Sequence, residues 1–418
     1  MEFMLLDLLP GQNGQEIVCQ TRTARVDQNT PYEAVSYKVG VTNNLHAALQ
    51  RLRDAEHTRT LWIDQLCIDQ WDVEKKAKQV DMMRLIYRQC SRCLIWLGEI
   101  PQDGEFNSDN VAMVFAFIQL SAGSSNSSQG LQELVARLLT PHATRRAQQA
   151  LIALSIKGNP WWSRIWTIQE SVLPKEAQVV WGSQKIEWAD VQQAARNFCQ
   201  SLWHLPEPLT TKFVDWLDNL VSPVRGLELA TGADSALNIL EKWRYRGATD
   251  PRDKIFALMG LFSGSPFPSL THCDYNLSAA TLYTKVTVDL LEIERGLRPL
   301  IGIRDSINTS LPSWVTDFER VPNIETSERW WNHAHRYVRY NADNDSVFEY
   351  KYLPQLGALE LTGIRVDGVG EVSQKMPEAY DHVEVSEDDL IGVIRSWSQE
   401  TSWNSPKFDE AYDNDSFR

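Results

Sequence analysis

One carboxylate follows a tryptophan-rich segment near the middle of the chain. Residues 161–170 read WWSRIWTIQE, so Glu170 closes a run that holds three indole side chains. A carboxylate can stabilise the positive charge that develops on a sugar ring when its glycosidic bond breaks, and aromatic faces can hold a planar ring beside it. A plainer role is also open to Glu170, which can form an ion pair with a basic residue such as Arg164. The indole rings can simply fill the core; they belong to Trp161, Trp162 and Trp166.

Two further carboxylates stand where a buried strand is expected to end. Residues 61–63 form a compact apolar run, Asp64 follows it directly, and Asp69 comes five residues later. Ligands of open α/β sheets bind at the carboxyl ends of parallel strands, so Asp64 and Asp69 can face the same crevice as Glu170. They can equally cap the turn and helix that come next, and their role is then structural.

A charged segment later in the chain reads DPRDK over residues 250–254. It precedes the apolar residues 255–261, and this order predicts a helix with Asp250 as its N-cap and Pro251 at its first position. We interpret Asp250, Arg252 and Asp253 first as a capping arrangement with an ion pair. A functional role for them is the alternative.

Motifs for metal, redox and phosphate chemistry are missing from the sequence. Cys90 and Cys93 form a C-x-x-C, but no second pair completes a zinc site, and the motif ends a predicted helix instead of opening one. Neither a dinucleotide glycine motif, a P-loop nor a G-x-S-x-G turn is present. We therefore expect two buried structural cysteines, no metal and no cofactor.

Composition narrows the partners and the compartment. The formal net charge of −14, from 41 basic and 55 acidic residues, would repel a nucleic acid backbone. No apolar segment approaches the roughly 20 residues of a membrane span, and Asp7 interrupts the apolar start of the chain, so we expect neither a signal peptide nor an anchor. Six scattered cysteines suit a reducing cytosol. We expect a cytoplasmic protein without nucleic acid or membrane partners.

The spacing of apolar residues predicts an α/β fold. A hairpin is expected over residues 3–20, with strands after it at 32–37, 61–64, 93–97 and 177–181. Helices are expected between the strands near 45–52 and 73–90, and later at 110–119, 131–139 and 143–156. Strands that alternate with helices form parallel sheets with helices on their faces. Beyond residue 190 the pattern is mostly helical, so we predict one domain over 1–190 and a helical or α+β region over 191–418.

Four segments, in this order, resemble the signatures of the heterokaryon-incompatibility (HET) domain of filamentous fungi. They are residues 32–40 (YEAVSYKVG), 61–70 (LWIDQLCIDQ) with its continuation to Tyr87, 96–98 (WLG) and 162–170 (WSRIWTIQE). The motif core therefore covers residues 32–171. The sequence departs from the family at Val39, where Trp is usual, and at Asp69, where Asn is commoner.

The HET domain is regarded as a remote relative of the Toll/interleukin-receptor (TIR) fold. Ser163, Trp166 and Glu170 are similar in spacing to the TIR Ser-x-x-Trp-x-x-x-Glu helix, and in TIR relatives that cleave NAD this Glu is catalytic. The resemblance thus implies a TIR-like sheet, NAD as a possible substrate and Glu170 as the catalytic carboxylate. Nicotinamide leaves as a neutral molecule, so no general acid is needed. The residues expected to bind substrate are Tyr37, Gly40, Asp64, Asp69, Trp162, Arg164 and Trp166.

The family resemblance implies an intracellular allorecognition factor whose HET domain triggers programmed cell death. One version is an enzyme, an NAD glycohydrolase completed by self-association. The other is an adaptor that signals by homotypic docking without catalysis. A third possibility is that Val39 marks an inactive relative. The expected partner is a second copy or another incompatibility protein, with the region after residue 190 in a regulatory role.

Overall fold

The computed structural model describes most of the first 300 residues and parts of the remainder. The described ranges are 1–12, 14–26, 30–36, 42–101, 104–123, 140–201, 219–228, 230, 235–262, 264–300, 310–319 and 348–362. The chain divides into two units, Met1–Glu360 and Leu361–Arg418, and almost all of the second lies outside the described residues. The division predicted at residue 190 is not tested by this partition and stays a prediction. Tyr37, Gly40 and the helix expected at 131–139 lie outside the described residues.

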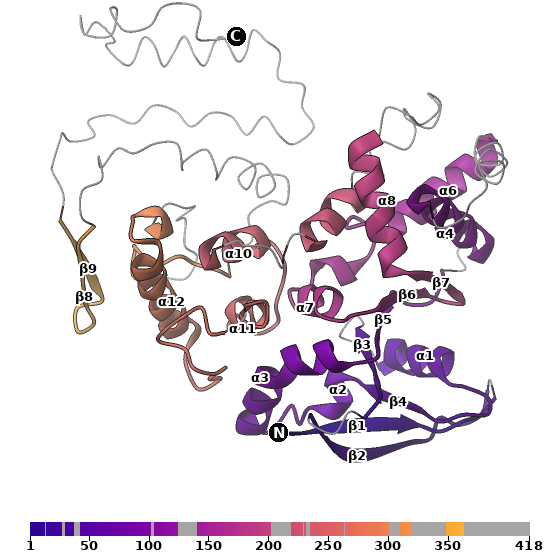
Figure 1. Ribbon diagram of the computed structural model, residues 1–418, viewed down its shortest axis with the longest axis horizontal. Helices are drawn as coiled ribbons and strands as arrows, with labels where there is room; N and C mark the ends of the chain where they lie inside the picture. The colour runs from indigo at the N-terminus through magenta and orange to yellow at the C-terminus, as the bar shows by residue number, and fades with distance from the viewer. Residues whose placement is uncertain are drawn as a thin grey trace, which may run out of the picture. The chain divides into compact units, whose positions relative to one another are not determined.

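A seven-stranded sheet organises the first half of the chain (Figure 1). Its strands, in spatial order, are β2 (Cys19–Arg25), β1 (Glu2–Leu8), β4 (Arg59–Trp62), β3 (Glu33–Ser36), β5 (Arg92–Trp96), β6 (Ala177–Trp181) and β7 (Gln184–Glu187). The four central strands β4, β3, β5 and β6 run parallel, while β1, β2 and β7 pair antiparallel at the two ends. The predicted parallel α/β sheet is confirmed.

The parallel strands are short apolar segments that the fold buries on both faces. Four of the five residues of β5 are buried, and the same is true of β6, as expected for strands covered on both sides. The hairpin and β4 differ from the sequence expectation in their boundaries. The second hairpin strand lies at Cys19–Arg25 instead of 16–20, and β4 ends at Trp62 because Asp64 opens the short helix α2 (Asp64–Cys67).

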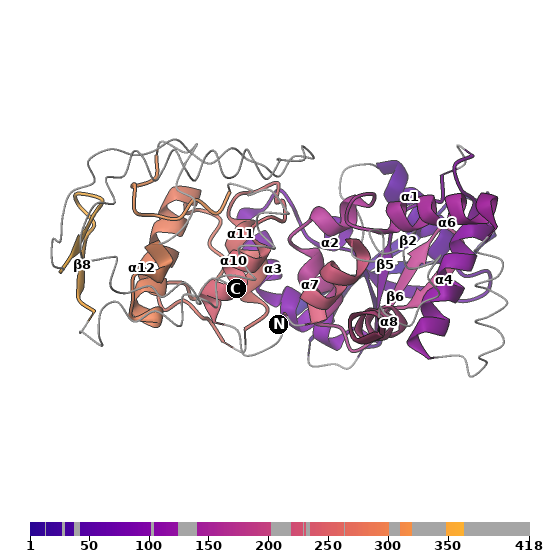
Figure 2. The ribbon, with the colours of Figure 1, turned by 90° about the horizontal axis from the view of Figure 1, so that it is seen from above.

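Helices pack around this sheet. The N-terminal half contributes α1 (Thr42–Leu52), α3 (Val73–Gln89) and α7 (Thr167–Val172), and the β6–β7 end carries α4 (Ser108–Ala122), α6 (Pro141–Leu154) and α8 (Trp188–Ser201). Helix α4 packs against α6 and α8 (Figure 1, Figure 2). Asp72 caps α3 through the backbone N–H of Lys75, and Asn107 forms a capping box with Asn110 at α4.

Downstream of α8 the described segments are mainly helical. They include α10 (Ala236–Trp243), α11 (Asp253–Met259), α12 (Ala279–Glu294) and a hairpin of β8 (Tyr350–Leu353) and β9 (Ala358–Leu361). Ser278 caps α12 by accepting a hydrogen bond from the backbone N–H of Thr281. The expected cap of α11 was wrong: α11 begins at Asp253, because the Asp250 carboxylate binds the backbone and guanidinium of Arg252 and shapes a turn before the helix.

Candidate functional site

The first and fourth HET-like segments meet at the carboxyl end of the parallel strand β3. Ser36, the last residue of β3, donates its hydroxyl hydrogen to the Glu170 carboxylate of α7. The Ser36 oxygen accepts a hydrogen bond of 2.7 Å from the indole Nε1 of Trp161. Glu170 and Trp161 are each only 1% exposed. The segments are therefore joined by a sealed hydrogen-bond chain, which we call the Glu170 cluster.

Burial decides the ionisation of Glu170. Removal from water raises the pKa of its carboxyl group to about 7, while Arg164 opposes the rise and Asp64 adds to it. The neutral and ionised forms of Glu170 are thus both accessible near neutral pH. Its hydrogen-bond partner is the Ser36 hydroxyl, and Arg164 acts on it electrostatically. Arg164 and Asp64 both line the adjacent cleft.

A cleft of about 840 Å³ opens beside this cluster. The HET-like half contributes residues of α2, the first turns of α3 and the segment before α7, including Asp64, Lys76, Arg164 and Trp166. The opposite wall consists of residues 247–253 together with Tyr275. Segments almost two hundred residues apart in the chain therefore share one concave surface.

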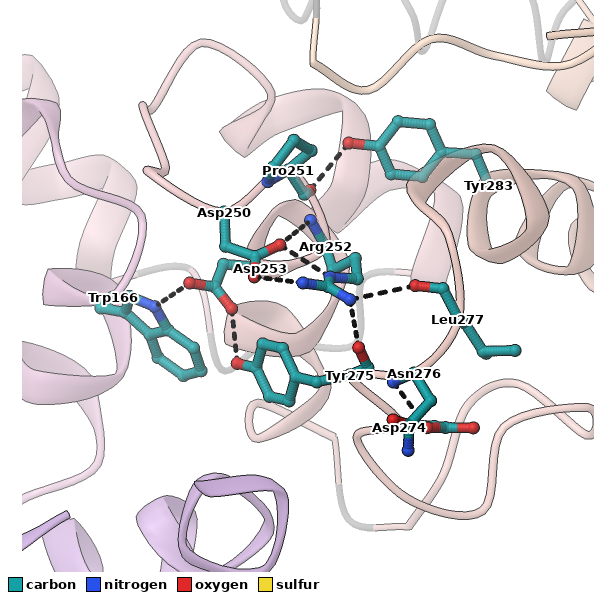
Figure 3. Close-up of polar contacts among 10 residues, drawn as sticks. All are labelled: Trp166, Asp250, Pro251, Arg252, Asp253, Asp274, Tyr275, Asn276, Leu277 and Tyr283. Carbon is teal, nitrogen blue, oxygen red and sulfur yellow. Dashed lines mark hydrogen bonds and ion pairs between the residues drawn. The ribbon is translucent and has the colours of Figure 1, made fainter. Parts of the chain in front are cut away.

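Asp253 joins the two walls of the cleft (Figure 3). Its Oδ2 accepts a hydrogen bond of 3.0 Å from the Trp166 indole Nε1, and its Oδ1 accepts one of 2.6 Å from the Tyr275 hydroxyl. Burial raises the pKa of Asp253, and the two donors oppose that rise. Burial also raises the pKa of Tyr275, so its hydroxyl keeps the proton that it donates. We call Asp253, Trp166 and Tyr275 the Asp253 cluster.

The segment that carries Asp253 is held from several sides. Arg252 and Asp250 form a bidentate ion pair, with Nε to Oδ1 at 2.8 Å and Nη2 to Oδ2 at 2.7 Å. The remaining nitrogen, Nη1, donates to the carbonyl oxygens of Tyr275 and Leu277 (Figure 3). Tyr283 of α12 donates to the Pro251 carbonyl at 2.7 Å. The ion pair expected within this segment is confirmed, and it fixes the backbone of the cleft wall.

The same downstream segment is attached along α7. Residues Arg164 and Gly247 form an isolated parallel β-bridge. Fully buried Arg246 donates to the Thr167 hydroxyl at 2.7 Å and lies 4.9 Å from the ring centroid of Trp243. Gln169 donates to the Ala257 carbonyl at 2.7 Å. These contacts surround Glu170 on its own helix and help to exclude water from it.

The predicted ligand-binding residues separate into two groups. Asp64, Arg164 and Trp166 line the cleft. Trp162 is 2% exposed, packs against Trp161 and Trp188, and donates to the Leu154 carbonyl at 2.7 Å. Asp69 accepts from the backbone of Trp71 and lies 3.6 Å from the Lys75 ammonium group. Binding roles for Trp162 and Asp69, and a catalytic role for Glu170, stay predictions.

Sequence reasoning missed Tyr275 and Lys76 as cleft residues. It noted the charges of residues 250–253 but favoured a capping role for them. The available signal was chemical: three charged side chains within four residues exceed what one helix start needs. Their partners, Trp166 and Tyr275, are 87 and 22 residues away from Asp253, so local spacing did not reveal them.

Metal and thiol chemistry find no support in the described part of the chain. No group of three or more His, Cys, Asp and Glu side chains there is arranged to hold a metal ion. Cys90 and Cys93 are buried free thiols. Burial raises the pKa of Cys90 to about 12 and that of Cys93 well above its ordinary value, which disfavours the reactive thiolate. Within the described residues, no helix combines the length and apolar character required to cross a membrane.

Comparison with known proteins assigns the first part of the chain. The sequence model of the family described as Heterokaryon incompatibility protein (HET) matches residues 12–170. Residues 12–170 are thus similar to a HET domain. Heterokaryon incompatibility protein 6, OR allele, of Neurospora crassa is 25% identical to this chain over a match that covers 75% of this chain and 57% of that protein.

The similarity to HET proteins covers only part of the chain and part of the relative. The chain spans little more than half the length of that curated relative. No solved structure matches the chain, and the TIR-like character of the HET domain stays a prediction. The family match ends at Glu170, so residues 247–253 and Tyr275, which form the second wall of the cleft, lie outside it.

Proposed function

We propose that this chain acts in heterokaryon incompatibility, as an allorecognition factor whose HET domain triggers programmed cell death. The HET family match and the similarity to an incompatibility protein of Neurospora crassa support this role. The structural observation that carries the proposal is the Glu170 cluster. Ser36 and Glu170 come from two separate family signatures and form a hydrogen bond, and Trp161, which directly precedes the second signature, donates to Ser36. This arrangement is expected if the signatures maintain one functional centre.

The cytosol is the proposed location. All six cysteines are free, and four of them are buried, which suits a reducing compartment. The proposed partner is a second copy of the chain or another incompatibility protein. Nucleic acid is disfavoured as a partner by the net charge of −14.

The enzymatic form of the proposal is cleavage of NAD after self-association. The bond between the ribose carbon and the nicotinamide nitrogen breaks, its electron pair stays on nicotinamide, and water adds to the ribosyl cation with release of a proton. An ionised Glu170 would stabilise that cation. Glu170 is 1% exposed in the described conformation, so association must first expose it. Contact with water would also return its pKa toward 4.5 and favour the ionised form.

Nicotinamide release tests this form. The full chain is incubated with NAD at increasing protein concentration, beside Glu170→Gln and the matched control Glu176→Gln, whose side chain is 61% exposed. We expect release that rises with assembly, is retained in the control and is lost in Glu170→Gln. Equal release by all three proteins, or none from the assembled wild type, would reject NAD cleavage by Glu170.

A second candidate is an adaptor that signals by homotypic docking without catalysis. Two observations together favour it. Glu170 is sealed from solvent, whereas Trp71, in the turn before α3, is 96% exposed and can contact a partner. Expression in a fungal host distinguishes the candidates through cell death. An adaptor keeps its toxicity in Glu170→Gln and loses it in Trp71→Ser. Loss of toxicity in Glu170→Gln with folding and assembly intact would exclude the adaptor.

A further inference from the structure

The cleft has the size and composition of a site for a small organic ligand. Its volume of about 840 Å³ lies within the range of roughly 300–1,000 Å³ that is typical of such sites. Residues from the HET-like half and from the downstream segment line it. They include the indole of Trp166, the phenol of Tyr275 and charged groups of both signs. This mixed polar and aromatic lining differs from the buried surroundings of Trp161 and Trp162, which are 1% and 2% exposed.

The indole ring of Trp166 is prepared to stack against a planar group. Its Nε1 hydrogen is already used by Asp253 at 3.0 Å, so the surface that remains for a ligand is the aromatic face. Because Asp253 is itself held by Tyr275 at 2.6 Å, the plane of the Trp166 ring is set by the downstream segment. Trp166 is only partly buried, whereas the neighbouring Trp161 and Trp162 are 1% and 2% exposed. Trp166 is thus the member of the tryptophan run that faces the cleft.

A lysine supplies the charge on the same surface. The Lys76 ammonium group lies 4.4 Å from the centroid of the Tyr275 ring, and among the residues that the structure describes no carboxylate lies within ion-pair distance of it. The nearby carboxylates are bound elsewhere: Asp250 holds Arg252, and Asp253 accepts from Trp166 and Tyr275. Lys76 lowers the pKa of Asp250 and Asp253 only from a longer distance. Its hydrogen-bond donors can therefore bind an anionic group of a ligand.

We propose that this cleft binds a ligand that combines a planar ring with an anionic group, as a nucleotide does. The ring stacks on Trp166, the anionic group binds Lys76, and Asp253 acts as a positioning residue for the indole. The site is composite, because its downstream wall lies beyond the HET family match. This inference deepens the proposed function and rests on it for the choice of nucleotides as probes, but it does not require that NAD be cleaved.

Calorimetric titration of the full chain tests the ligand class. The probes are AMP and ADP-ribose, which carry both features, adenosine, which lacks the phosphate, and ribose 5-phosphate, which lacks the ring. We expect the first two to bind at least about tenfold more tightly than the others, the ratio for one charge-assisted contact or one stacked ring. Failure of AMP and ADP-ribose to bind, or equal affinity for all four probes, would overturn the proposal.

Adjacent lysines on α3 provide a matched pair of variants. Lys76→Gln removes the cation from the cleft, whereas Lys75→Gln removes a neighbouring cation that pairs with Asp69 and Asp72. We expect Lys76→Gln to weaken AMP about tenfold and to leave adenosine unchanged. Lys75→Gln should leave both affinities unchanged. The same loss in both lysine variants would show a general charge effect and would contradict the site.

The positioning role of Asp253 needs a readout that a loss of structure would not produce. Asp253→Asn is expected to weaken AMP severalfold while ribose 5-phosphate, which does not use the indole, keeps its affinity. Trp166→Phe retains an aromatic face without the N–H and should bind AMP better than Trp166→Leu does. A parallel loss of both probes in Asp253→Asn, or equal affinities of the two Trp166 variants, would contradict the stacking.

Nicotinamide release, measured on the same samples, separates this inference from the proposed function. Binding of AMP that depends on Lys76, without any NAD cleavage, would support the cleft and reject the enzymatic form. Cleavage that depends on Glu170, with AMP binding unaffected by Lys76→Gln, would support the enzymatic form and reject the cleft as its ligand site.

Discussion

Glu170 and Asp253 are both buried carboxyl groups that hold distant segments together, yet they face different surroundings. Glu170 is 1% exposed, accepts a hydrogen bond from the Ser36 hydroxyl and lies outside the lining of the cleft. Asp253 is 8% exposed, has two donors in Trp166 and Tyr275 and lies in the lining. Glu170, which closes the most tryptophan-rich of the HET-like segments, is thus sealed. The accessible polar groups lie where the downstream segment meets the HET-like part of the chain.

Burial raises the pKa of both carboxyl groups, but the influences that oppose the rise differ. Each donor to a carboxylate favours the charged form, while burial favours the neutral form. For Glu170 burial dominates and raises its pKa to about 7. For Asp253 burial again raises the pKa, but the donors Tyr275 and Trp166 are the next largest influences and both oppose the rise. Hydrogen bonds are thus the main influence that opposes burial at Asp253, whereas at Glu170 the charge of Arg164 is the larger one.

The largest expected effect is on stability, and it distinguishes Trp161 of the Glu170 cluster from Trp166 of the Asp253 cluster. Trp161→Ala empties a fully buried site and should lower the free energy of unfolding by about 3–5 kcal/mol. Trp166→Ala should cost less than half of that, because the ring is only partly buried. Urea denaturation of both variants measures the difference. Equal costs would show that the two indoles do not occupy sealed and open surroundings.

The next effect concerns the pH dependence of stability at Glu170. Its pKa rises from 4.5 to about 7 on folding, so its contribution to stability is fully present below about pH 4.5 and is lost as the pH rises to about 7. The loss amounts to ~3 kcal/mol, since each unit by which the pKa differs between the unfolded and the folded protein corresponds to about 1.4 kcal/mol.

Glu170→Gln isolates this dependence because glutamine stays neutral and can still accept from Ser36. Relative to wild type, the variant should gain stability progressively between about pH 4.5 and about pH 7 and show a constant difference above that range. Chemical denaturation across this range measures the gain. A difference that does not change with pH would mean that Glu170 is not held in its neutral form by burial.

A smaller effect is expected in the Asp253 cluster. Tyr275→Phe removes one of the two donors to Asp253 and should cost about 0.5–1.5 kcal/mol. Asp253→Asn should cost about 1–3 kcal/mol, because the amide offers one acceptor oxygen to two donors. The two changes share one hydrogen bond, so the double variant should cost less than their sum. Strict additivity in denaturation experiments would show that Tyr275 does not support Asp253.

The smallest effect serves as a reference outside both clusters. Arg51 and Glu99 form an ion pair at 2.8 Å with side chains 43% and 42% exposed. Solvent screens a pair of this kind, so Arg51→Ala should change the free energy of unfolding by less than about 1 kcal/mol. A larger loss would indicate that surface charge, and not burial, dominates stability in this half of the chain.

Much of the fold could be predicted because its elements are local. The alternation of apolar runs with helical spacing located the parallel strands. The start of α11 was mispredicted because Asp250 had two uses for its carboxylate. It can cap a helix or bind the guanidinium of Arg252, and only the surrounding chain selects between them.

The candidate site was predicted in part. Asp64, Arg164 and Trp166 were expected to lie together and do line one cleft. The other wall was not predicted, because no periodicity connects Tyr275 or Lys76 to the tryptophan run. Burial of Glu170 likewise depends on residues 246–257. Arg246 and Ala257 contact α7 residues that lie 79 and 88 positions earlier in the chain.

The sequence by itself determined the elements, the HET signatures and the presence of a carboxylate beside three indoles, since these depend on residue type and near spacing. Tertiary structure alone decided which indole is accessible and which carboxyl group is sealed. Ser36 and Glu170 are 134 residues apart, and Trp166 and Asp253 are 87 apart. Hydrogen bonds across such distances form only after the chain has packed, and the packing sets how much water each group retains.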